Sequence, residues 1–592
     1  MRDESLKYKK FSRRSLVIGG IKLFFFSVIA GRYYYLQMMS SGKFTTLSDK
    51  NRLKLMVITA PRGVIYDCNR EVIASNSSNF RVGIDSLAIP NISELIDHIS
   101  NVLGVNFEIS DEDLRRKLAK RQPNDYLFLK DNLDWREVNK LIESDHILPG
   151  VEVIESSHRS YQFPEAFAHI TGYVSTPNKQ EVESFSMPIS EQLKVGKIGI
   201  EKIFNDTLVG YPGLKKTEVD ARGRFIRTIS TDEPVPGQSL VLSINAKLQS
   251  FIHEMLTNRG LTASVIVMNV QNGDVLALHS TPSFDPNLFV DGISKDDWER
   301  IIKADSNPLL NHAITSAYPP GSTFKLVTAF SGLIAGLDPR TQYHCPGEFR
   351  LGSRVFKCWR ASGHGSIDLS TAISQSCNVY FFNMALKMGI NKLHTGAKML
   401  GLGERTDIEL LGEVEGLMPN PEWKKRRYKL DWYPGDTVNA SIGQGYTLLT
   451  PLQIATMTAR IASGNYVNPK LVPGDRFIEP IDVDPKVFEL IRGGMYDCLN
   501  RPKGILYSRQ LSIGNFAVCG KTGTAQVVAL KYKHLGHNFK HHGLFTSFAP
   551  FDNPKYAVTV VVEHGEAGAK VSPIAKEIYN FILENIETTG AA

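Results

Sequence analysis

The chain has 592 residues, of which 42% are hydrophobic and 22% charged, and its net charge is +7. This length predicts two or three domains of ordinary globular composition. A charge this small on so long a chain argues against nucleic acid as a partner.

The N-terminus combines a basic leader with a long apolar stretch from about Leu16 to Leu36. About 20 helical residues cross a hydrocarbon core of ~30 Å. Lys22 and Arg32 interrupt the stretch, although long basic side chains snorkel near its ends. No small-x-small cleavage site follows, so a retained anchor is favoured over a cleaved signal peptide or a buried core helix. We expect a cytoplasmic tail (1–14) and a transmembrane anchor (15–38) with the rest of the chain outside, because the basic flank comes first.

The next segment, 39–235, shows no catalytic constellation. Its short strands, the charged helix expected from Asp111 to Arg121 and the glycine-rich Gly196–Glu201 indicate a mixed, elongated region. Pro234–Gly237 is a plausible boundary, after which Leu240–Ile244 begins new structure. We therefore expect a second domain from 236 to 592.

Five strands are expected in this second half. Ser264–Val270 and Asp274–His279 flank a hairpin signal at Gln271–Gly273. Asn515–Cys519 leads into a strand around Lys521, and two strands follow at His542–Ala549 and Tyr556–Val562. A large helical insertion separates the first two strands from the last three, and a helix from Pro573 to Ile586 closes the chain. The pattern predicts an α+β fold with one five-stranded antiparallel sheet flanked by helices.

Three short motifs carry the chemistry. Ser322-Thr-Phe-Lys325 puts a hydroxyl and an amine on one face of a helix, at a helix start that follows Pro319-Pro-Gly321. Ser376-Cys-Asn378 and Lys521-Thr-Gly523 follow in that order. Each motif alone is common, and an N-capping serine with a solvated lysine would account for Ser322 but for none of the others. Together they form the signature of penicillin-recognising serine acyl-transferases.

The chain resembles the class B penicillin-binding proteins, most closely the penicillin-binding protein 2 group of elongation-type peptidoglycan D,D-transpeptidases. The resemblance covers nearly the whole length. One difference follows Asp67, where the family usually has Arg-Asn-Gly and this chain has Cys68-Asn69-Arg70, which puts the turn geometry in question. The motifs that carry the resemblance are Ala60–Asp67, Arg159–Tyr161, His169–Val174, Gly199–Glu201, Ser441–Tyr446, Thr450–Gln453 and Val562–Gly565.

The resemblance implies the substrate and the role of each residue. The donor is a stem peptide ending in D-Ala-D-Ala; Lys325 takes the proton of Ser322, which attacks the penultimate carbonyl. Backbone N–H groups of Ser322 and Thr524 form the oxyanion hole. Ser376 relays a proton to the leaving D-Ala, Asn378 holds the peptide amide, and Lys521, Thr522 and Thr524 bind the terminal carboxylate. Gly523, without a side chain, would let a peptide lie against its strand.

The resemblance also implies a setting. The protein would be a single-pass protein of the bacterial inner membrane with a periplasmic catalytic domain, acting in cell-wall elongation and maintenance of rod shape. Segment 39–235 would be a non-catalytic pedestal, the penicillin-binding protein dimerisation-type domain. Expected partners are stem peptides that supply donor and acceptor amine, β-lactams that acylate Ser322, a SEDS-family glycan polymerase and other elongation-complex proteins.

Four residues form a candidate metal set: Cys345, Cys358, His364 and Cys377. Three thiolates and an imidazole suit tetrahedral zinc, although two of the cysteines could instead form a disulfide in an oxidising compartment. The resemblance favours a structural zinc, which would fix the Ser376–Asn378 motif; the chemistry itself requires no cofactor. We expect Cys68, Cys498 and Cys519 to be buried apolar residues.

Other functions remain open. A β-lactamase-like hydrolase or D,D-carboxypeptidase would pass the acyl group to water, and carboxypeptidase activity could accompany transpeptidation. A division-type transpeptidase would share the motifs; the Cys/His cluster favours the elongation type. A scaffold that mainly activates a SEDS polymerase would not need the intact catalytic set, although a second, activating role is compatible with it.

Overall fold

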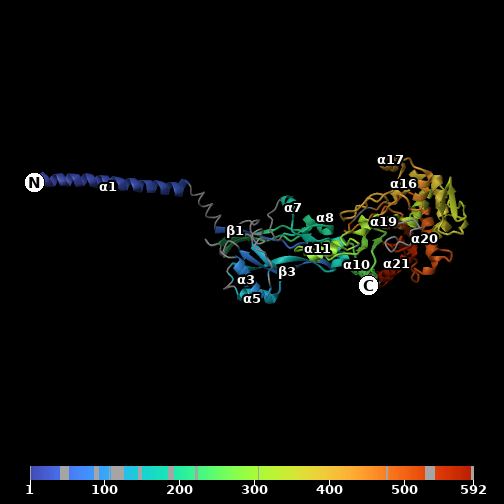
Figure 1. Ribbon diagram of the computed structural model, residues 1–592, viewed down its shortest axis with the longest axis horizontal. Helices are drawn as coiled ribbons and strands as arrows, with labels where there is room; N and C mark the ends of the chain where they lie inside the picture. The colour runs from blue at the N-terminus through green and yellow to red at the C-terminus, as the bar shows by residue number, and fades with distance from the viewer. Residues whose placement is uncertain are drawn as a thin grey trace.

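The first element is a long helix, α1 (Arg2–Tyr34), which continues into one π-turn, η1 (Tyr35–Met39). From Arg13 to Met39 it is long and apolar enough to cross a membrane, and none of this stretch is buried in the protein. A helix of this length and composition is typical of a single-pass membrane anchor. Figure 1 shows it projecting from one end of an elongated molecule.

The structure is a computed structural model, and it describes most of the chain after this helix. The described residues are 2–39, 52–85, 92–105, 107, 126–144, 148, 150–184, 193–219, 225–304, 306–474, 478–526 and 540–587. The predicted helix from Asp111 to Arg121 lies outside them.

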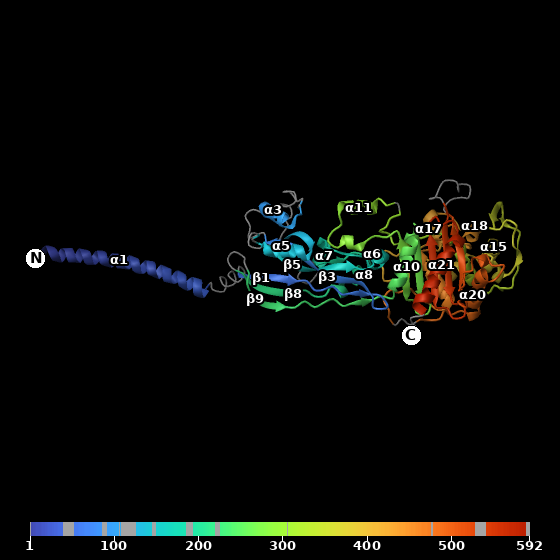
Figure 2. The ribbon, with the colours of Figure 1, turned by 90° about the horizontal axis from the view of Figure 1, so that it is seen from below.

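Among the described residues the pedestal contains two larger sheets and a two-stranded one, β6 (Val174–Ser175) with β7 (Val195–Gly196); Figure 2 shows the larger strands. The first has the order β1-β8-β9, and the second has the order β10-β2-β3-β4 with β5 also paired to β3. A small apolar core joins two helices, α3 (Ile92–Leu103) and α5 (Trp135–Glu143), to the second sheet. The strands are β1 (Leu53–Ile58), β2 (Ile65–Tyr66), β3 (Val72–Asp85), β4 (Tyr126–Leu133), β5 (Val151–Tyr161), β8 (Gly213–Val219), β9 (Phe225–Asp232) and β10 (Leu240–Val241).

A buried ion network connects three of the pedestal motifs. Glu201, in α8 (Gly199–Ile203), is fully buried and accepts hydrogen bonds from Nε of Arg62 at 2.6 Å and Nε of Arg159 at 2.7 Å. Burial raises the pKa of Glu201, but the two guanidinium groups outweigh it and hold that pKa below its usual value. The network therefore holds together three segments that are far apart in the sequence.

A hydrogen bond between a side chain and a backbone N–H joins the pedestal to the second half. Oδ2 of Asp67 accepts from the backbone N–H of Ala246, the first residue of α10 (Ala246–Thr257), at 3.1 Å. The turn after Asp67 closes through an Arg70 N–H to Asp67 carbonyl bond of 3.1 Å, with Arg70 at φ +67°. The turn thus keeps a left-handed residue although arginine replaces the glycine expected there.

The second half is built on the five-stranded sheet that the sequence predicts. Its order is β12-β11-β19-β18-β17, and all four pairings are antiparallel. The two strands before the insertion and the three after it therefore form one sheet, which confirms the predicted fold class. The strands are β11 (Ala263–Asn269), β12 (Val275–Thr281), β17 (Cys519–Ala525), β18 (His542–Ala549) and β19 (Tyr556–Val562).

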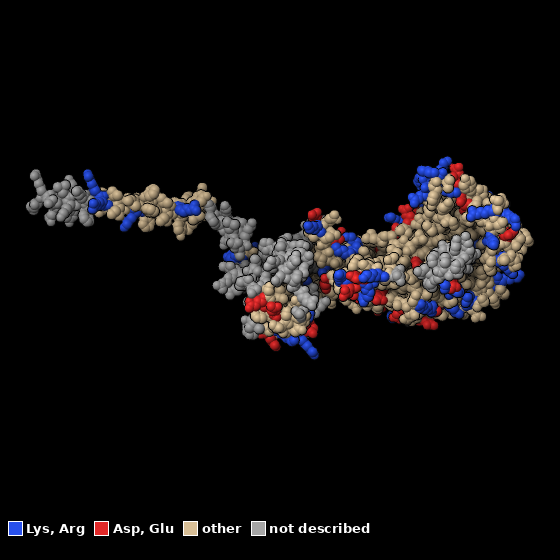
Figure 3. Space-filling model, in the orientation of Figure 1, with Lys and Arg blue, Asp and Glu red and all other residues tan. Residues whose placement is uncertain are grey.

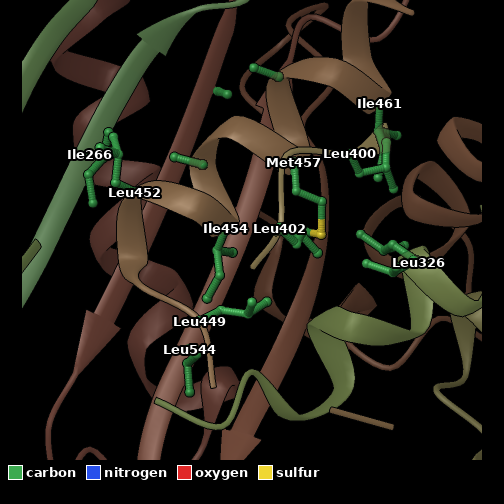
Figure 4. Packing of buried hydrophobic residues seen from close by; sticks show 14 of the residues in the cluster. Ile266, Leu326, Leu400, Leu402, Leu449, Leu452, Ile454, Met457, Ile461 and Leu544 are labelled. Atoms are coloured by element: carbon green, nitrogen blue, oxygen red, sulfur yellow. The ribbon is translucent and has the colours of Figure 1, made fainter. Parts of the chain in front are cut away.

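Helices cover both faces of this sheet. One face packs against α10 and the C-terminal helix α21 (Gly568–Ile582). The other packs against α19 (Pro451–Ser463), whose Leu452 and Met457 lie between the sheet and Leu326 of α13 (Lys325–Ile334), as Figure 4 shows. The motif Thr450–Gln453 starts α19 as a capping box, in which the Thr450 hydroxyl and the Gln453 amide oxygen each accept the other residue's backbone N–H at 3.1 Å.

The insertion and the connections supply the remaining elements. In the insertion, α14 (Leu369–Ser374) precedes the second catalytic motif and packs against α20 (Pro485–Asn500). The others include β13 (Tyr343–Cys345), β14 (Glu348–Leu351), β15 (Arg354–Lys357), β16 (Gly365–Ile367), α15 (Asn378–Met388), α16 (Ile390–Met399), α17 (Pro421–Tyr428), α18 (Pro434–Ala440), α6 (Pro164–Thr171), α7 (Lys179–Ser184), α9 (Asn205–Leu208), α11 (Lys295–Ile302) and α12 (His312–Thr315).

Two expectations need correction, and a third is confirmed. The closing helix begins at Gly568 rather than at Pro573, because the Ser572 hydroxyl donates to the Ala569 carbonyl that the proline cannot serve. The strand around Lys521 begins at Cys519, so the run from Asn515 leads into it as expected. Cys498 and Cys519 are buried as expected, but Cys68 is exposed.

Candidate active site

Ser322 lies in a tight turn that leads into a buried helix. The turn is the 3-10 helix η5 (Gly321–Phe324), and α13 follows directly from Lys325. Phe324 and Leu326 are fully buried on either side of Lys325. Their apolar packing therefore fixes the directions of the Ser322 hydroxyl and the Lys325 amine. The predicted helix start at Ser322 is therefore present, with one 3-10 turn before the α-helix.

The amine of Lys325 is the centre of the site. Its side chain is fully buried, and Nζ lies 2.7 Å from the Ser376 carbonyl, 2.6 Å from Oδ1 of Asn378 and 3.1 Å from the Ser376 hydroxyl. Burial, and then the positive charge of Lys521, lower the pKa of Lys325 well below that of an ordinary lysine. A neutral amine donates to the two carbonyl oxygens and has its lone pair free for a hydroxyl proton.

The second motif is held in a strained turn. Ser376 has φ +55°, a left-handed conformation that costs a non-glycine residue roughly 1–3 kcal/mol. Asn378 begins α15, and its Nδ2 donates to the Lys357 carbonyl at 3.0 Å. Because Oδ1 faces Lys325, the amide orientation is fixed from both ends. The structure thus brings Ser376 and Asn378 to Lys325, as the motifs suggest.

Lys521 supplies a second cation on β17. It is fully buried, and its Nζ has no hydrogen-bond partner among the described residues. Burial lowers the pKa of Lys521. An unpaired buried amine is costly, which favours a role in holding an anionic group of a ligand. Thr522 is nearly buried and Thr524 half-buried on the same strand, and β17 is an edge strand of its sheet.

The structure gives a reason for a glycine at position 523 that the sequence did not predict. A Cβ at this position would lie 2.6 Å from the Pro320 carbonyl oxygen and 3.0 Å from Cγ2 of Thr323. The missing side chain leaves room for the turn that carries Ser322, and the pairing of a peptide with the free edge of β17 stays a prediction. Gly523 therefore allows the close approach of β17 to the nucleophile's turn.

Two residues that the motif analysis did not assign to the site also hold this turn. The Gly443 carbonyl accepts from the backbone N–H of Gly321 at 3.0 Å, and Nε2 of Gln444 donates to the Thr524 carbonyl at 3.1 Å. A Cβ on Gly321, which has φ +55°, would lie 2.9 Å from the Thr524 nitrogen. The backbone of Thr524 is thus next to Ser322, as an oxyanion hole made by both requires. The sequence signal for these two residues is the motif Ser441–Tyr446, which contains two glycines and the side-chain amide of Gln444.

The four candidate metal ligands come together from four segments. Their ligand atoms lie within 4.8 Å of one another. Nδ1 of His364 is 3.6 Å from Sγ of Cys345 and 3.6 Å from Sγ of Cys358, close to the edge of roughly 3.5–3.8 Å of a tetrahedral zinc site. A hydrogen bond with Cys377 lowers the pKa of Cys358 below that of an ordinary thiol. All six cysteines are free thiols, and the residues fit a tetrahedral ion.

The fold and this site define a class: serine acyl-transferases with a penicillin-binding domain. The description "Penicillin binding protein transpeptidase domain" matches residues 263–584, and "Penicillin-binding Protein dimerisation domain" matches 57–242. In the structure, β10 still pairs with β2, so the boundary expected at 235/236 stays a prediction.

Individual relatives are similar over nearly the whole chain. A peptidoglycan D,D-transpeptidase MrdA of Haemophilus influenzae is 34% identical over 98% of this chain and 93% of its own length. A penicillin-binding protein 2 of Helicobacter pylori, solved in a complex with MreC, is 30% identical with a TM-score of 0.80, covering 90% of this chain and 99% of that one. A chain of a peptidoglycan synthase complex is 28% identical with a TM-score of 0.71, covering 95% and 97%.

This chain belongs to the class B penicillin-binding proteins of the penicillin-binding protein 2 type. The resemblance read from the motifs is confirmed, and the division-type alternative is not favoured.

Proposed function

We propose that the protein is a serine-type peptidoglycan D,D-transpeptidase that crosslinks stem peptides during cell-wall elongation. One observation carries the proposal: the buried amine of Lys325 contacts Ser376 and Asn378 while Lys521 lowers its pKa. This arrangement supplies a general base one helical turn from Ser322. Lys521, the other amine of the site, has no hydrogen-bond partner among the described residues, so we assign the base to Lys325.

Acylation follows from these contacts. The neutral amine of Lys325 takes the hydroxyl proton of Ser322, and Oγ bonds to the carbonyl carbon of the penultimate D-Ala. The N–H groups of Ser322 and Thr524 stabilise the resulting oxyanion; removal of one such donor typically costs ~3–4 kcal/mol. The proton then passes from Lys325 to the Ser376 hydroxyl, 3.1 Å away, and on to the departing nitrogen. The C–N bond breaks, and D-Ala leaves as a free amine.

The remaining residues bind and orient the donor. Lys521, Thr522 and Thr524 hold the terminal carboxylate, and Asn378 holds the peptide amide. In the second half of the reaction an amine of a neighbouring stem attacks the carbonyl carbon of the acyl-enzyme and gives a proton to the neutral amine of Lys325. The ester C–O bond then breaks, and Oγ of Ser322 regains its proton from Lys325. If water attacks instead, the same site acts as a D,D-carboxypeptidase.

The test uses the full-length chain in nanodiscs, with glycan strands that carry D-Ala-D-Ala stems. Mass spectrometry of the digested product should show crosslinked stems and released D-Ala, both lost in Ser322→Ala. Release of D-Ala without crosslinks would indicate a hydrolase and contradict the proposal.

A structural zinc ion is a second part of the proposal. Cys345, Cys358, His364 and Cys377 would hold it, and Cys377 lies between the two residues of the second motif. The ion would fix the backbone there and supply no step of the reaction. We expect one zinc per chain by elemental analysis and its loss in Cys358→Ser, with the exposed Cys68→Ser as control. Well-folded wild type without zinc would refute this part.

The setting is the third part. We place the N-terminus in the cytoplasm and the catalytic half in the periplasm at the inner membrane, with a SEDS-family glycan polymerase and other elongation-complex proteins as partners. The relative solved with MreC and the relative in a synthase complex support such partners. The pedestal would also activate the polymerase. Pedestal variants that bind penicillin normally and leave polymerase activity unchanged would count against that role.

A further inference from the structure

A basic and aromatic surface lies beside the candidate active site, and the reaction described above does not use it. We call it the α17 ledge and define it as Trp423, Lys425, Arg426, Arg427, Tyr428, Lys429, Leu430 and Tyr433. Figure 3 shows Lys and Arg gathered over the projecting end of the catalytic half where α17 lies. Tyr428, Leu430 and Tyr433 are 48%, 52% and 58% exposed, which is unusual for large apolar side chains grouped together.

Three cations of the ledge are not paired with an acidic residue in the part of the chain that the structure describes. Lys425 lies 3.5 Å from Asp431, whereas Arg426, Arg427 and Lys429 make no ion pair within the described part of the chain. Lys429 also sits at φ +60°. Clustered cations at the C-terminal end of a helix are favoured by its dipole, but three without counter-charges remain available for an anionic ligand.

Packed side chains beneath the ledge hold it in place. The buried Lys424 binds Oδ2 of Asp436 at 2.6 Å, and its Nζ lies 4.8 Å from the ring centre of Tyr433. Trp423 and Tyr428 pack on Tyr446 with ring centres 5.2 and 5.4 Å apart. The exposed groups are therefore held on a fixed support.

Two short series of contacts connect the ledge to the turn that carries Ser322 and to the Ser376–Asn378 motif. Tyr446 belongs to the same loop as Gly443, which bonds the backbone next to Ser322. On the other side, a Cβ on Gly435 would lie 3.6 Å from Phe356 of β15, whose neighbour Lys357 accepts from Asn378. The ledge is thus connected, through Tyr446 on one side and Gly435 of α18 on the other, to the turn that carries Ser322 and to the second motif.

We propose that the α17 ledge binds the acceptor strand: an anionic, peptide-substituted glycan. The proposal rests on the proposed function, because only a transpeptidase needs an acceptor. Donor recognition already uses Lys521 and β17. Stem peptides carry several free carboxylates, which Arg426, Arg427 and Lys429 complement, and sugar rings pack well on exposed aromatic faces. The acceptor amine would then reach the acyl-enzyme from the side on which the α17 ledge lies.

A membrane surface is the other anionic partner to consider. The ledge lies on the catalytic half, and the pedestal separates that half from α1 (Figures 1 and 2). A bilayer that holds α1 would not reach α17 in this arrangement, so the polymer is the better match.

The experiment measures crosslinking by the full-length chain in zwitterionic nanodiscs with a fixed stem-peptide donor. Three acceptors are compared: glycan strands with free carboxylates, the same strands with amidated carboxylates, and hydroxylamine. The variant Arg426→Gln/Arg427→Gln/Lys429→Asn removes three charges, with asparagine chosen because it tolerates φ +60°. Lys295→Gln/Arg300→Gln/Lys303→Gln on α11 removes the same charge elsewhere.

We expect the ledge variant to raise KM for the anionic strand about tenfold, and high salt to do the same to wild type. KM for the amidated strand and for hydroxylamine, the rate of penicillin acylation, and all values for the α11 variant should stay unchanged. The single variant Arg427→Glu should show the same selective loss.

An unchanged KM for the anionic strand in both ledge variants would overturn the proposal. So would a loss that appears only in nanodiscs of anionic lipid, since the ledge would then contact a membrane. Wild type that forms no penicillin adduct would instead refute the proposed function, so the two failures are distinguishable.

Discussion

The contact between Gly523 and the nucleophile's turn is the feature of the site that a single methyl group tests. In Gly523→Ala the new Cβ would lie 2.6 Å from the Pro320 carbonyl oxygen, which belongs to the backbone and cannot rotate away. To restore an ordinary contact, β17 and the turn must separate by about 0.5 Å or more. A misplacement near 1 Å typically costs about 100-fold in rate. We therefore expect the second-order rate of penicillin acylation at Ser322 to fall by roughly 10- to 100-fold.

The assay follows a fluorescent penicillin under rapid mixing, with circular dichroism and thermal melting on the same samples. Overpacking should also cost about 1–3 kcal/mol of stability. Gly493→Ala in α20 is the matched control, because a Cβ there meets nothing within 4 Å and alanine favours a helix. Acylation of Gly523→Ala within twofold of wild type would refute the reasoning.

Three further predictions concern buried charge and backbone strain. Glu201→Gln leaves two buried guanidinium groups without a carboxylate and should lower the free energy of unfolding in urea by about 3–5 kcal/mol; a loss below about 1 kcal/mol would contradict the network. Acylation should rise with pH through the lowered pKa of Lys325 and level off above it. In Lys521→Met the repelling charge is gone, so the pKa of Lys325 rises and this limb must move to higher pH; a limb at the same or lower pH would contradict the assigned role. Arg70→Gly should stabilise the chain by about 1 kcal/mol in the same urea titration, because glycine accepts φ +67° without strain, and destabilisation would show that the arginine side chain matters.

Local patterns were sufficient to predict most of the second half. The expected strands His542–Ala549 and Tyr556–Val562 coincide with β18 and β19, because both are apolar runs bounded by turn residues. Proline at 573 predicts a helix start, but the helix begins at Gly568, and a serine hydroxyl lets the proline lie inside it. Catalytic motifs could be grouped because each type has a known chemical use.

Close approaches between distant segments left no such pattern. Nothing in the sequence around Gly523 shows that Pro320 will lie 2.6 Å from its missing side chain. In the sequence Glu201 is one residue of a motif, and its pairing with two arginines depends on three segments that only the fold brings together. Exposure of Cys68 is likewise a property of the tertiary structure. Sequence therefore identified the residue types, and the fold was needed for their spacing.

The central claim is that Ser322 is the nucleophile of a penicillin-binding transpeptidase. Its most direct test is intact and peptide mass spectrometry of the full-length chain after incubation with a fluorescent penicillin, beside Ser322→Ala. We predict one stable adduct on the peptide that contains Ser322 and none in the variant. A folded, zinc-replete wild type without an adduct, or an adduct that persists in Ser322→Ala, would contradict it.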